Sequence, residues 1–360
     1  MNHLTSVTAA SLIAGLLGAP LPEIPGDQEE SESRIGKSMK KGAARARTVA
    51  ELPEDTALPL IREIQAASLG GQFPSVDGRP VEFVVRSYKP RKRVTIEVRA
   101  GRCRFAVKAY ASDPAPEAEL YDALAAAGLA GGAAVRVPRL LAYDPGLRME
   151  VIGWLEGPSA QDLIGSGRGE QAGKLAASWI LRAAVLTVNL GPALDVALTR
   201  REAVRWTAKL DSADPGLGTA ARAVADTLTR TSPKEGVPRL VHGSLYARHV
   251  LDLSGATGLI DWDCFGQGAL EADAGMFLAT VSRIGLLNDS LAGEATRAEK
   301  AFLAATGDLL DERSLAWHRA AALLHLAERG SKQTDRRQSD WLSRSQVLLA
   351  EAARMAAAAG

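Results

Sequence analysis

The side chains best suited to chemistry lie in residues 239–276. An apolar run there leads into His242-Gly243 and a polar stretch. A short strand is predicted at 250–253, and a returning strand at 257–260 ends in the acidic group Asp261-Trp262-Asp263. A strand that delivers carboxylates at its end, beside a polar loop, can hold a divalent cation against a phosphate. The segment therefore predicts chemistry on a phosphate-bearing substrate.

This layout resembles the catalytic segment of the aminoglycoside phosphotransferase and choline-kinase group. These are small-molecule kinases with a protein-kinase-like fold. The resemblance rests on His242-Gly243, then Val250-Leu251, then Ile260-Asp261-Trp262-Asp263. It implies an α+β, bilobal architecture with a small antiparallel sheet plus helix in the N-lobe and a larger, mainly helical C-lobe. It also implies ATP and Mg²⁺ as cofactors, with Mn²⁺ as the alternative metal, and a small-molecule acceptor of unknown identity.

The catalytic loop departs from the family pattern at two positions. The family's loop reads H-G-D-x-x-x-x-N, in which the Asp is the catalytic base and the Asn is a metal ligand. Here Ser244 stands in place of the Asp and His249 in place of the Asn. Asp261 matches the family's metal-binding Asp, and Asp273 matches a downstream Asp that supports the loop. The resemblance thus implies Asp261 and His249 as the metal ligands.

The altered loop changes the expected chemistry. A general base contributes about 10²–10⁴-fold to a rate. Ser244 cannot act as a base at neutral pH without an activator, but its hydroxyl can orient an acceptor hydroxyl or a water. Asp263 is the nearest carboxylate that could replace the base or add a metal ligand. An imidazole at His249 favours one metal ion or Mn²⁺, or serves as the proton acceptor itself. His242 is expected to anchor the loop.

A candidate phosphate-binding lysine lies in the predicted N-lobe. Residues 81–110 read as three strands, and the third contains the stretch 103–110, which resembles the kinase V-A-I-K pattern at Lys108. An amphipathic helix is predicted from Glu117 onward. By the resemblance, Glu117 pairs with Lys108 and orients it, with Glu119 as the second choice. Acidic residues in a first helical turn also occur for dipole reasons alone.

The turn between the first two strands carries cations in place of a glycine-rich loop. Lys89 and Arg91, with Lys92 and Arg93, could cover the phosphates of a nucleotide. The alternative is an ordinary charged hairpin turn that faces solvent. Further along, residues 148–155 are predicted to form a strand that leads into the hinge. The resemblance implies that backbone groups of Val151 and Gly153 bind the adenine edge.

Composition places the chain among cytoplasmic, two-lobed proteins. The 360 residues are 46% hydrophobic, the net charge is +1, and the two cysteines, Cys103 and Cys264, lie far apart in the sequence. These values predict no nucleic-acid partner, no disulfide framework and no membrane-spanning helix. The predicted divisions are an N-terminal helix and charged arm at 1–50, an N-lobe at 51–154 and a helical C-lobe at 155–360. His318 and His325 are predicted to be structural.

The N-terminal segment leaves alternatives open. The apolar stretch 9–19 is predicted to be a short helix that packs on the body, and a signal peptide is the other interpretation, although no Lys or Arg precedes it. Residues 22–50 are first acidic and then basic, as in a solvated arm. That arm could also contact an anionic surface or a protein partner.

Three functions remain open from the sequence. The first is an ATP-dependent phosphotransferase with a variant loop. The second is a pseudokinase that binds a nucleotide or a partner without turnover, which the changes at Ser244 and His249 favour. The third is a kinase-like fold used for another transfer, such as nucleotidylation.

Overall fold

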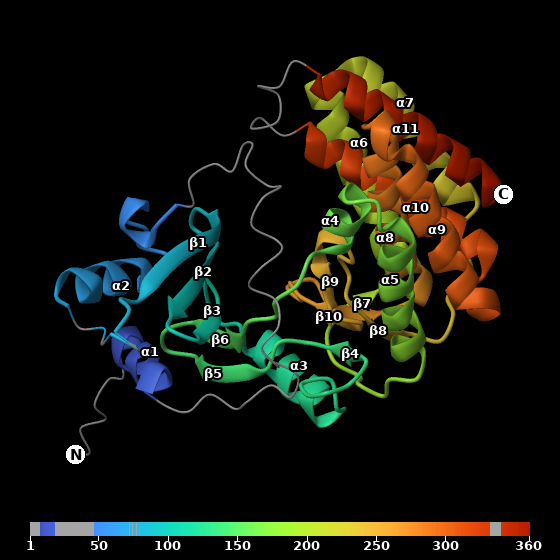
Figure 1. Cartoon of the computed structure of the whole chain (residues 1–360). Helices are drawn as coiled ribbons and strands as arrows, with labels where there is room; N and C mark the ends of the chain where they lie inside the picture. The colour runs from blue at the N-terminus through green and yellow to red at the C-terminus, as the bar shows by residue number, and fades with distance from the viewer. Residues whose placement is uncertain (1–7, 19–46, 72, 74, 77, 332–339) are drawn as a thin grey trace. The chain divides into compact units, whose positions relative to one another are not determined.

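The computed structural model of the chain describes residues 8–18, 47–71, 73, 75–76, 78–331 and 340–360 (Figure 1). The chain divides into two compact units. The described residues up to Gly132, together with Pro138–Trp154, form the N-terminal unit, and Ala133–Val137 with Leu155–Gly360 form the C-terminal unit. The secondary structure is mixed α+β, as the sequence predicts.

The N-terminal unit is built on a five-stranded sheet in which all neighbouring strands are antiparallel. Its strand order is β1-β2-β3-β6-β5. The strands are β1 (Glu82–Lys89), β2 (Arg93–Ala100), β3 (Cys103–Tyr110), β5 (Leu140–Asp144) and β6 (Met149–Gly153). The three strands predicted within 81–110 are therefore confirmed. Because side chains alternate along a strand, Val94, Ile96 and Val98 all lie buried on one face.

That apolar face packs against two helices, α1 (Ala9–Gly18) and α2 (Leu60–Leu69). Ile13 and Leu17 of α1 and Ile64 of α2 are buried in the same core as the sheet. The prediction of a short helix that packs on the body is therefore confirmed. Of the predicted charged arm at 22–50, residues 22–46 lie outside the described residues.

The opposite face of the sheet is polar. Glu97 is fully buried and accepts hydrogen bonds from the guanidinium groups of Arg86, Arg99 and Arg104. Lys108 projects from the same face, since it lies four residues beyond Arg104 on β3. Helix α3 (Ala115–Ala126) follows and confirms the amphipathic helix predicted from Glu117.

Two small sheets in the C-terminal unit position the candidate catalytic segment. One has the order β4-β10-β9 and the other β7-β11-β8. Their strands are β4 (Val135–Arg136), β7 (Ala193–Leu194), β8 (Arg239–Val241), β9 (Val250–Leu253), β10 (Ala256–Leu259) and β11 (Gly266–Gly268). The predicted turn at Ser254 and Gly255 joins β9 to β10, and both residues have positive φ, 56° and 100°.

Helices make up most of the C-terminal unit (Figure 1). They are α4 (Ala160–Gly165), α5 (Gly169–Ala184), α6 (Val196–Ala213), α7 (Pro215–Arg230), α8 (Leu270–Leu286), α9 (Ala292–Thr306), α10 (Glu312–Gly330) and α11 (Trp341–Ala358). Their main core surrounds Trp317, which is fully buried and donates its indole N–H to Leu228 O at 2.8 Å. In the described part of the chain, no helix combines the length and the apolarity needed to cross a bilayer.

Candidate active site

A buried carboxylate in α8 fixes the start of the catalytic loop. Asp273 is 1% exposed. Its Oδ2 accepts hydrogen bonds from His242 N (2.7 Å) and from Trp179 Nε1 (2.8 Å), and its Oδ1 accepts one from Gly243 N (2.9 Å). Burial raises the pKa of Asp273, although these hydrogen bonds and His242 act in the opposite direction. Asp273 thus supports the loop, as predicted.

Gly243 is required by the shape of this loop. Its φ is +72°, in the left-handed region that favours glycine. A Cβ built at this position would lie 1.9 Å from Cys264 O. The close approach of the two backbones places the loop next to the segment that follows Asp261.

His242 anchors the loop and also engages Ser244. His242 is fully buried, and its Nε2 lies 2.9 Å from Ile260 O. A carbonyl oxygen can only accept, so Nε2 carries the proton and, in the neutral ring, Nδ1 is an acceptor. The Ser244 hydroxyl, 3.3 Å from Nδ1, is then the donor of that hydrogen bond. The lone pairs of Ser244 Oγ remain able to accept a hydrogen bond from a substrate hydroxyl.

The two predicted metal ligands face each other. His249 is 4% exposed, and its Nδ1 donates to Ser244 O at 2.9 Å. The Nε2 lone pair is therefore directed toward Asp261 Oδ2, 3.2 Å away. Burial, together with the nearby His242, lowers the pKa of His249 to about 3, and Asp261 opposes this shift only in part. His249 is neutral at pH 7, which leaves two acceptors in contact.

This arrangement fits a divalent cation. Adjacent ligands of an octahedral ion with bonds of about 2.1 Å lie about 3 Å apart, close to the separation of Nε2 and Oδ2. Within the described residues, no group of three or more His, Cys, Asp or Glu side chains is placed to hold a metal. The other ligands would thus be phosphate oxygens and water. Asp261 also has φ +70°, a strained conformation typical of functional positions.

Asp263 lies just beyond this pair and is half-buried. Between the two aspartates, the fully buried Trp262 packs edge-on against Trp179, with ring centroids 5.2 Å apart, and against His242 at 4.7 Å. These contacts fix the backbone that carries both carboxylates. The role of Asp263 as a substitute base remains a prediction.

In the N-terminal unit, Lys108 lies among acidic groups. Its side chain is only 5% exposed, and its Nζ lies 3.3 Å from Glu117 Oε2 and 3.0 Å from Glu150 Oε1. The ion pair expected between Lys108 and Glu117 is therefore present, whereas Glu119 is exposed. The Tyr110 hydroxyl lies within hydrogen-bond distance of both Glu117 and Glu150.

Glu150 belongs to this cluster and was not predicted from the sequence. It pairs across the sheet with Lys108 and is fully buried, with an Oε2 atom that has no hydrogen-bond partner among the described residues. Burial raises the pKa of Glu150, and the charge of Glu117 adds to this effect, while Lys108 opposes it. The sequence did contain a sign of this role, because Glu150 is the one charged residue in the otherwise apolar strand Met149–Gly153.

The cationic turn between β1 and β2 is held by Asp55. Asp55 Oδ2 accepts hydrogen bonds from Arg91 N (2.8 Å) and from the Tyr88 hydroxyl (3.0 Å). Burial would raise the pKa of Asp55, but these bonds outweigh it and the pKa is lowered. The side chains of Lys89 and Arg91 are exposed. The backbone is thus a fixed, solvent-facing hairpin turn, and a contact of its cations with phosphate remains a prediction.

The backbone N–H groups of the predicted hinge residues take part in the sheet. Strand β6 lies between β3 and β5, so Val151 pairs with Val107 on one side and with Ala142 on the other. Gly153 N donates to Arg139 O at 2.8 Å. Because these backbone donors already serve the sheet, they are not available to an adenine edge. A contact of the carbonyl groups of this segment with the adenine edge remains a prediction.

Residues 82–323 match the family model described as "Phosphotransferase enzyme family". The chain belongs to the phosphotransferase enzyme family. A comparison with curated proteins found no match.

Solved structures of this family share the fold. The choline kinase LicA from Streptococcus pneumoniae superimposes with a TM-score of 0.55 at 14% identity, over 81% of this chain and 99% of that one. A spectinomycin phosphotransferase solved with ADP and spectinomycin gives 0.53 and 14%, over 81% and 98%. An amicoumacin kinase solved with AMP-PNP and Ca²⁺ gives 0.53 and 12%, over 81% and 93%. The protein-kinase-like fold predicted from the sequence is confirmed.

Proposed function

We propose that this phosphotransferase-family member uses ATP to phosphorylate a hydroxyl of a small molecule. The observation that carries the proposal is the facing pair of His249 Nε2 and Asp261 Oδ2, 3.2 Å apart, which suits a divalent cation. The family match and the nucleotides in two similar solved structures support ATP as the donor. When bound, a divalent cation supplies charge neutralisation at the phosphates.

Each unit contributes polar or charged groups of the kind that phosphoryl transfer needs. In the N-terminal unit, Lys108 would bind a phosphate oxygen, and Glu117 would keep its ammonium group in place. In the C-terminal unit, Ser244 Oγ would accept a hydrogen bond from the acceptor hydroxyl and orient it for attack. Positioning and charge neutralisation dominate this chemistry, so slow transfer is expected without an aspartate base.

The charges beside the loop favour a neutral or anionic acceptor. Arg248 lies over the Tyr246 ring, with its guanidinium carbon 4.1 Å from the centroid, and Arg329 lies 5.9 Å from the same centroid. Burial lowers the pKa of Arg248, Tyr246 and Asp261 oppose this shift, and the like charge of Arg329 adds to it. Among the described residues neither guanidinium has an ion-pair partner. A polycationic acceptor would be repelled here, since like charges in contact are unfavourable.

A nucleotide-binding pseudokinase is the second candidate. Because residue 244 is a serine, the loop offers no carboxylate at the position of the family's base, and the hydroxyl proton of Ser244 is already engaged by His242. This candidate predicts nucleotide binding without products.

Product analysis separates the candidates. The protein would be incubated with ATP, Mg²⁺ or Mn²⁺, and a panel of hydroxyl compounds, and the products would be resolved by mass spectrometry. We expect ADP and a phosphorylated acceptor, and Ser244→Asp should raise the rate by about 10-fold or more because it restores a base. Ser244→Ala, which restores none, is the control. Transfer of AMP would support nucleotidylation, and ATP binding without products in wild type and Ser244→Asp would support the pseudokinase.

A further inference from the structure

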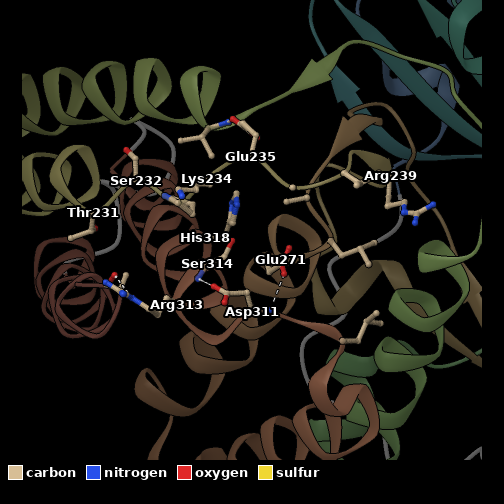
Figure 2. Close-up of a pocket in the computed structure, with 18 residues that line it drawn as sticks. Thr231, Ser232, Lys234, Glu235, Arg239, Glu271, Asp311, Arg313, Ser314 and His318 are labelled. Carbon is tan, nitrogen blue, oxygen red and sulfur yellow. Dashed lines mark hydrogen bonds between the residues drawn. The ribbon is translucent and has the colours of Figure 1, made fainter.

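A cavity of about 530 Å³ lies in the C-terminal unit, away from the catalytic loop (Figure 2). It is lined by the connection from α7 to β8 and by the beginnings of α8 and α10. No residue of 242–263 lines it. Its volume is within the range of small-molecule sites, about 300–1,000 Å³.

A buried histidine in this cavity lacks a hydrogen-bond partner at one ring nitrogen. His318 is 5% exposed, and its ring lies among the lining side chains (Figure 2). Its Nε2 is buried without a hydrogen bond, and among the described residues its ring contacts an aromatic side chain only at Trp317. Burial lowers the pKa of His318 to about 4, so the ring is neutral at pH 7. Buried polar groups are normally hydrogen-bonded, and the exceptions call for an explanation.

The carboxylates around the cavity already have structural partners. Glu235 accepts a hydrogen bond from Val196 N (2.7 Å), Glu271 accepts one from Asp311 N (3.0 Å), and Asp311 accepts one from Ser314 N (2.7 Å). The bond from Asp311 N to Glu271 holds the beginning of α10 against α8, and the bond from Ser314 N to Asp311 caps α10 itself. These carboxylates are therefore explained without a ligand.

The cationic side chains that line the cavity, unlike the carboxylates, do not all have structural partners. Arg313 is bound to the carbonyl oxygens of Ala359 and Gly360. The exposed Lys234 and the half-buried Arg239 line the cavity as well, yet neither side chain has a hydrogen bond or an ion pair with any residue that the structure describes. Two positive groups thus remain for a ligand.

The N-terminus of helix α8 adds partial positive charge to that of the two cations. It is 17 residues long and begins at the cavity, where its N-cap residue, Ala269, supplies no side-chain hydrogen bond. The first N–H groups of a helix have no partner within the helix and carry partial positive charge. They favour an anion at this end of the cavity.

We propose that this cavity binds a small organic anion that carries a phosphate or carboxylate group. Lys234, Arg239 and the beginning of α8 would hold the anionic group, and the neutral imidazole of His318 would hydrogen-bond to a polar group of the same ligand. The bound molecule would touch both elements that hold the catalytic loop. Arg239 begins the strand that precedes His242, and Glu271 lies two residues before Asp273.

Titration calorimetry with inorganic phosphate and with citrate tests this site directly. We expect saturable binding of at least one probe to the wild-type chain and at least a 10-fold weaker Kd in Lys234→Gln/Arg239→Gln. A matched control, Arg102→Gln/Lys300→Gln, removes two exposed cations elsewhere and should leave Kd unchanged. The tighter of the two probes identifies the anionic group. No saturable binding, or equal weakening in both double variants as expected of an adventitious ion only, would overturn the proposal.

The histidine gives a second readout that needs no activity. The ring signals of His318, assigned by comparison with His318→Gln, should shift when the probe saturates the protein. Unchanged His318 signals at saturation would exclude the imidazole from the site. Phosphate bound at the nucleotide site would be unaffected by Lys234→Gln/Arg239→Gln, because neither residue belongs to that site. The difference between the two double variants therefore reports on this cavity, and the proposal can fail or succeed independently of the proposed function.

Discussion

At the scale of single residues, Lys108 is more constrained than a phosphate-binding lysine requires. It is buried and lies between two carboxylates, of which Glu150 is fully enclosed. Removing one partner of a buried ion pair leaves the other charge uncompensated, which costs about 3–5 kcal/mol. A phosphate that binds Lys108 must therefore compete with Glu150 as well as with Glu117.

A double-mutant cycle tests this arrangement. Lys108→Met should lower the free energy of unfolding by about 3–5 kcal/mol, because it strands Glu150 in an apolar strand. Lys108→Met/Glu150→Met should recover most of that loss, since both charges are removed. Urea unfolding of the single and double variants gives the coupling. Equal instability of the two variants would show that Glu150 is not the stranded partner. If Lys108 binds phosphate, neither variant should turn over ATP.

At the scale of secondary structure, local backbone geometry decides where the chemistry lies. Gly243→Ala forces a positive φ on a residue with a Cβ and drives that Cβ into Cys264 O, whereas Gly255→Ala forces the same φ region with open space around it. We expect Gly255→Ala to cost about 1–2 kcal/mol and Gly243→Ala clearly more. Thermal unfolding measures both. Equal losses in melting temperature would contradict the close packing of the loop against the segment after Asp261.

The sequence predicted these elements where periodicity and turn residues agreed. Val94, Ile96 and Val98 alternate cleanly, and Ser254-Gly255 marks its hairpin, so those strands were recognised. The pairing of Lys108 with Glu150 was missed, because the register between β3 and β6 is set by tertiary packing and not by local pattern. The same register places Val151 in a central strand, which uses its backbone N–H groups on both sides.

The catalytic segment was predictable for a different reason. Its residues lie close together in the sequence, so the family resemblance alone assigns His242, His249 and Asp261 to one site. The orientation of His249 Nε2 toward Asp261 was not predictable, because it depends on the hydrogen bond from Nδ1 to Ser244 O. The cavity around His318 was missed because its lining comes from segments far apart in the chain.

At the scale of the whole molecule, buried histidines make stability depend on pH. The pKa of His318 is about 4 in the folded chain, below its ordinary value of 6.5. The unfolded chain therefore binds a proton that the folded chain does not. The resulting stability is complete above about pH 6.5 and is lost as the pH falls toward 4.

His318→Gln should remove this dependence. Between pH 7 and pH 5 the wild type should lose about 2 kcal/mol through His318, and the variant should lose that much less over the same interval. Urea unfolding followed by tryptophan fluorescence, with Trp317 beside the mutated position, measures the difference at each pH. The same pH dependence in both proteins would contradict the assignment of this proton uptake to His318.

The proposed chemistry draws on a lysine held by carboxylates in the N-terminal unit and on the pair of His249 and Asp261, proposed to bind a metal, in the C-terminal unit. The central claim is that Asp261 and His249 bind a divalent cation together with ATP. Calorimetric titration of ATP, without metal and with Mg²⁺ or Mn²⁺, tests it most directly. We predict metal-dependent binding, weakened at least 10-fold in Asp261→Ala and unchanged in Asp308→Ala, an exposed control. ATP binding that needs no metal, or that survives Asp261→Ala intact, would contradict the claim.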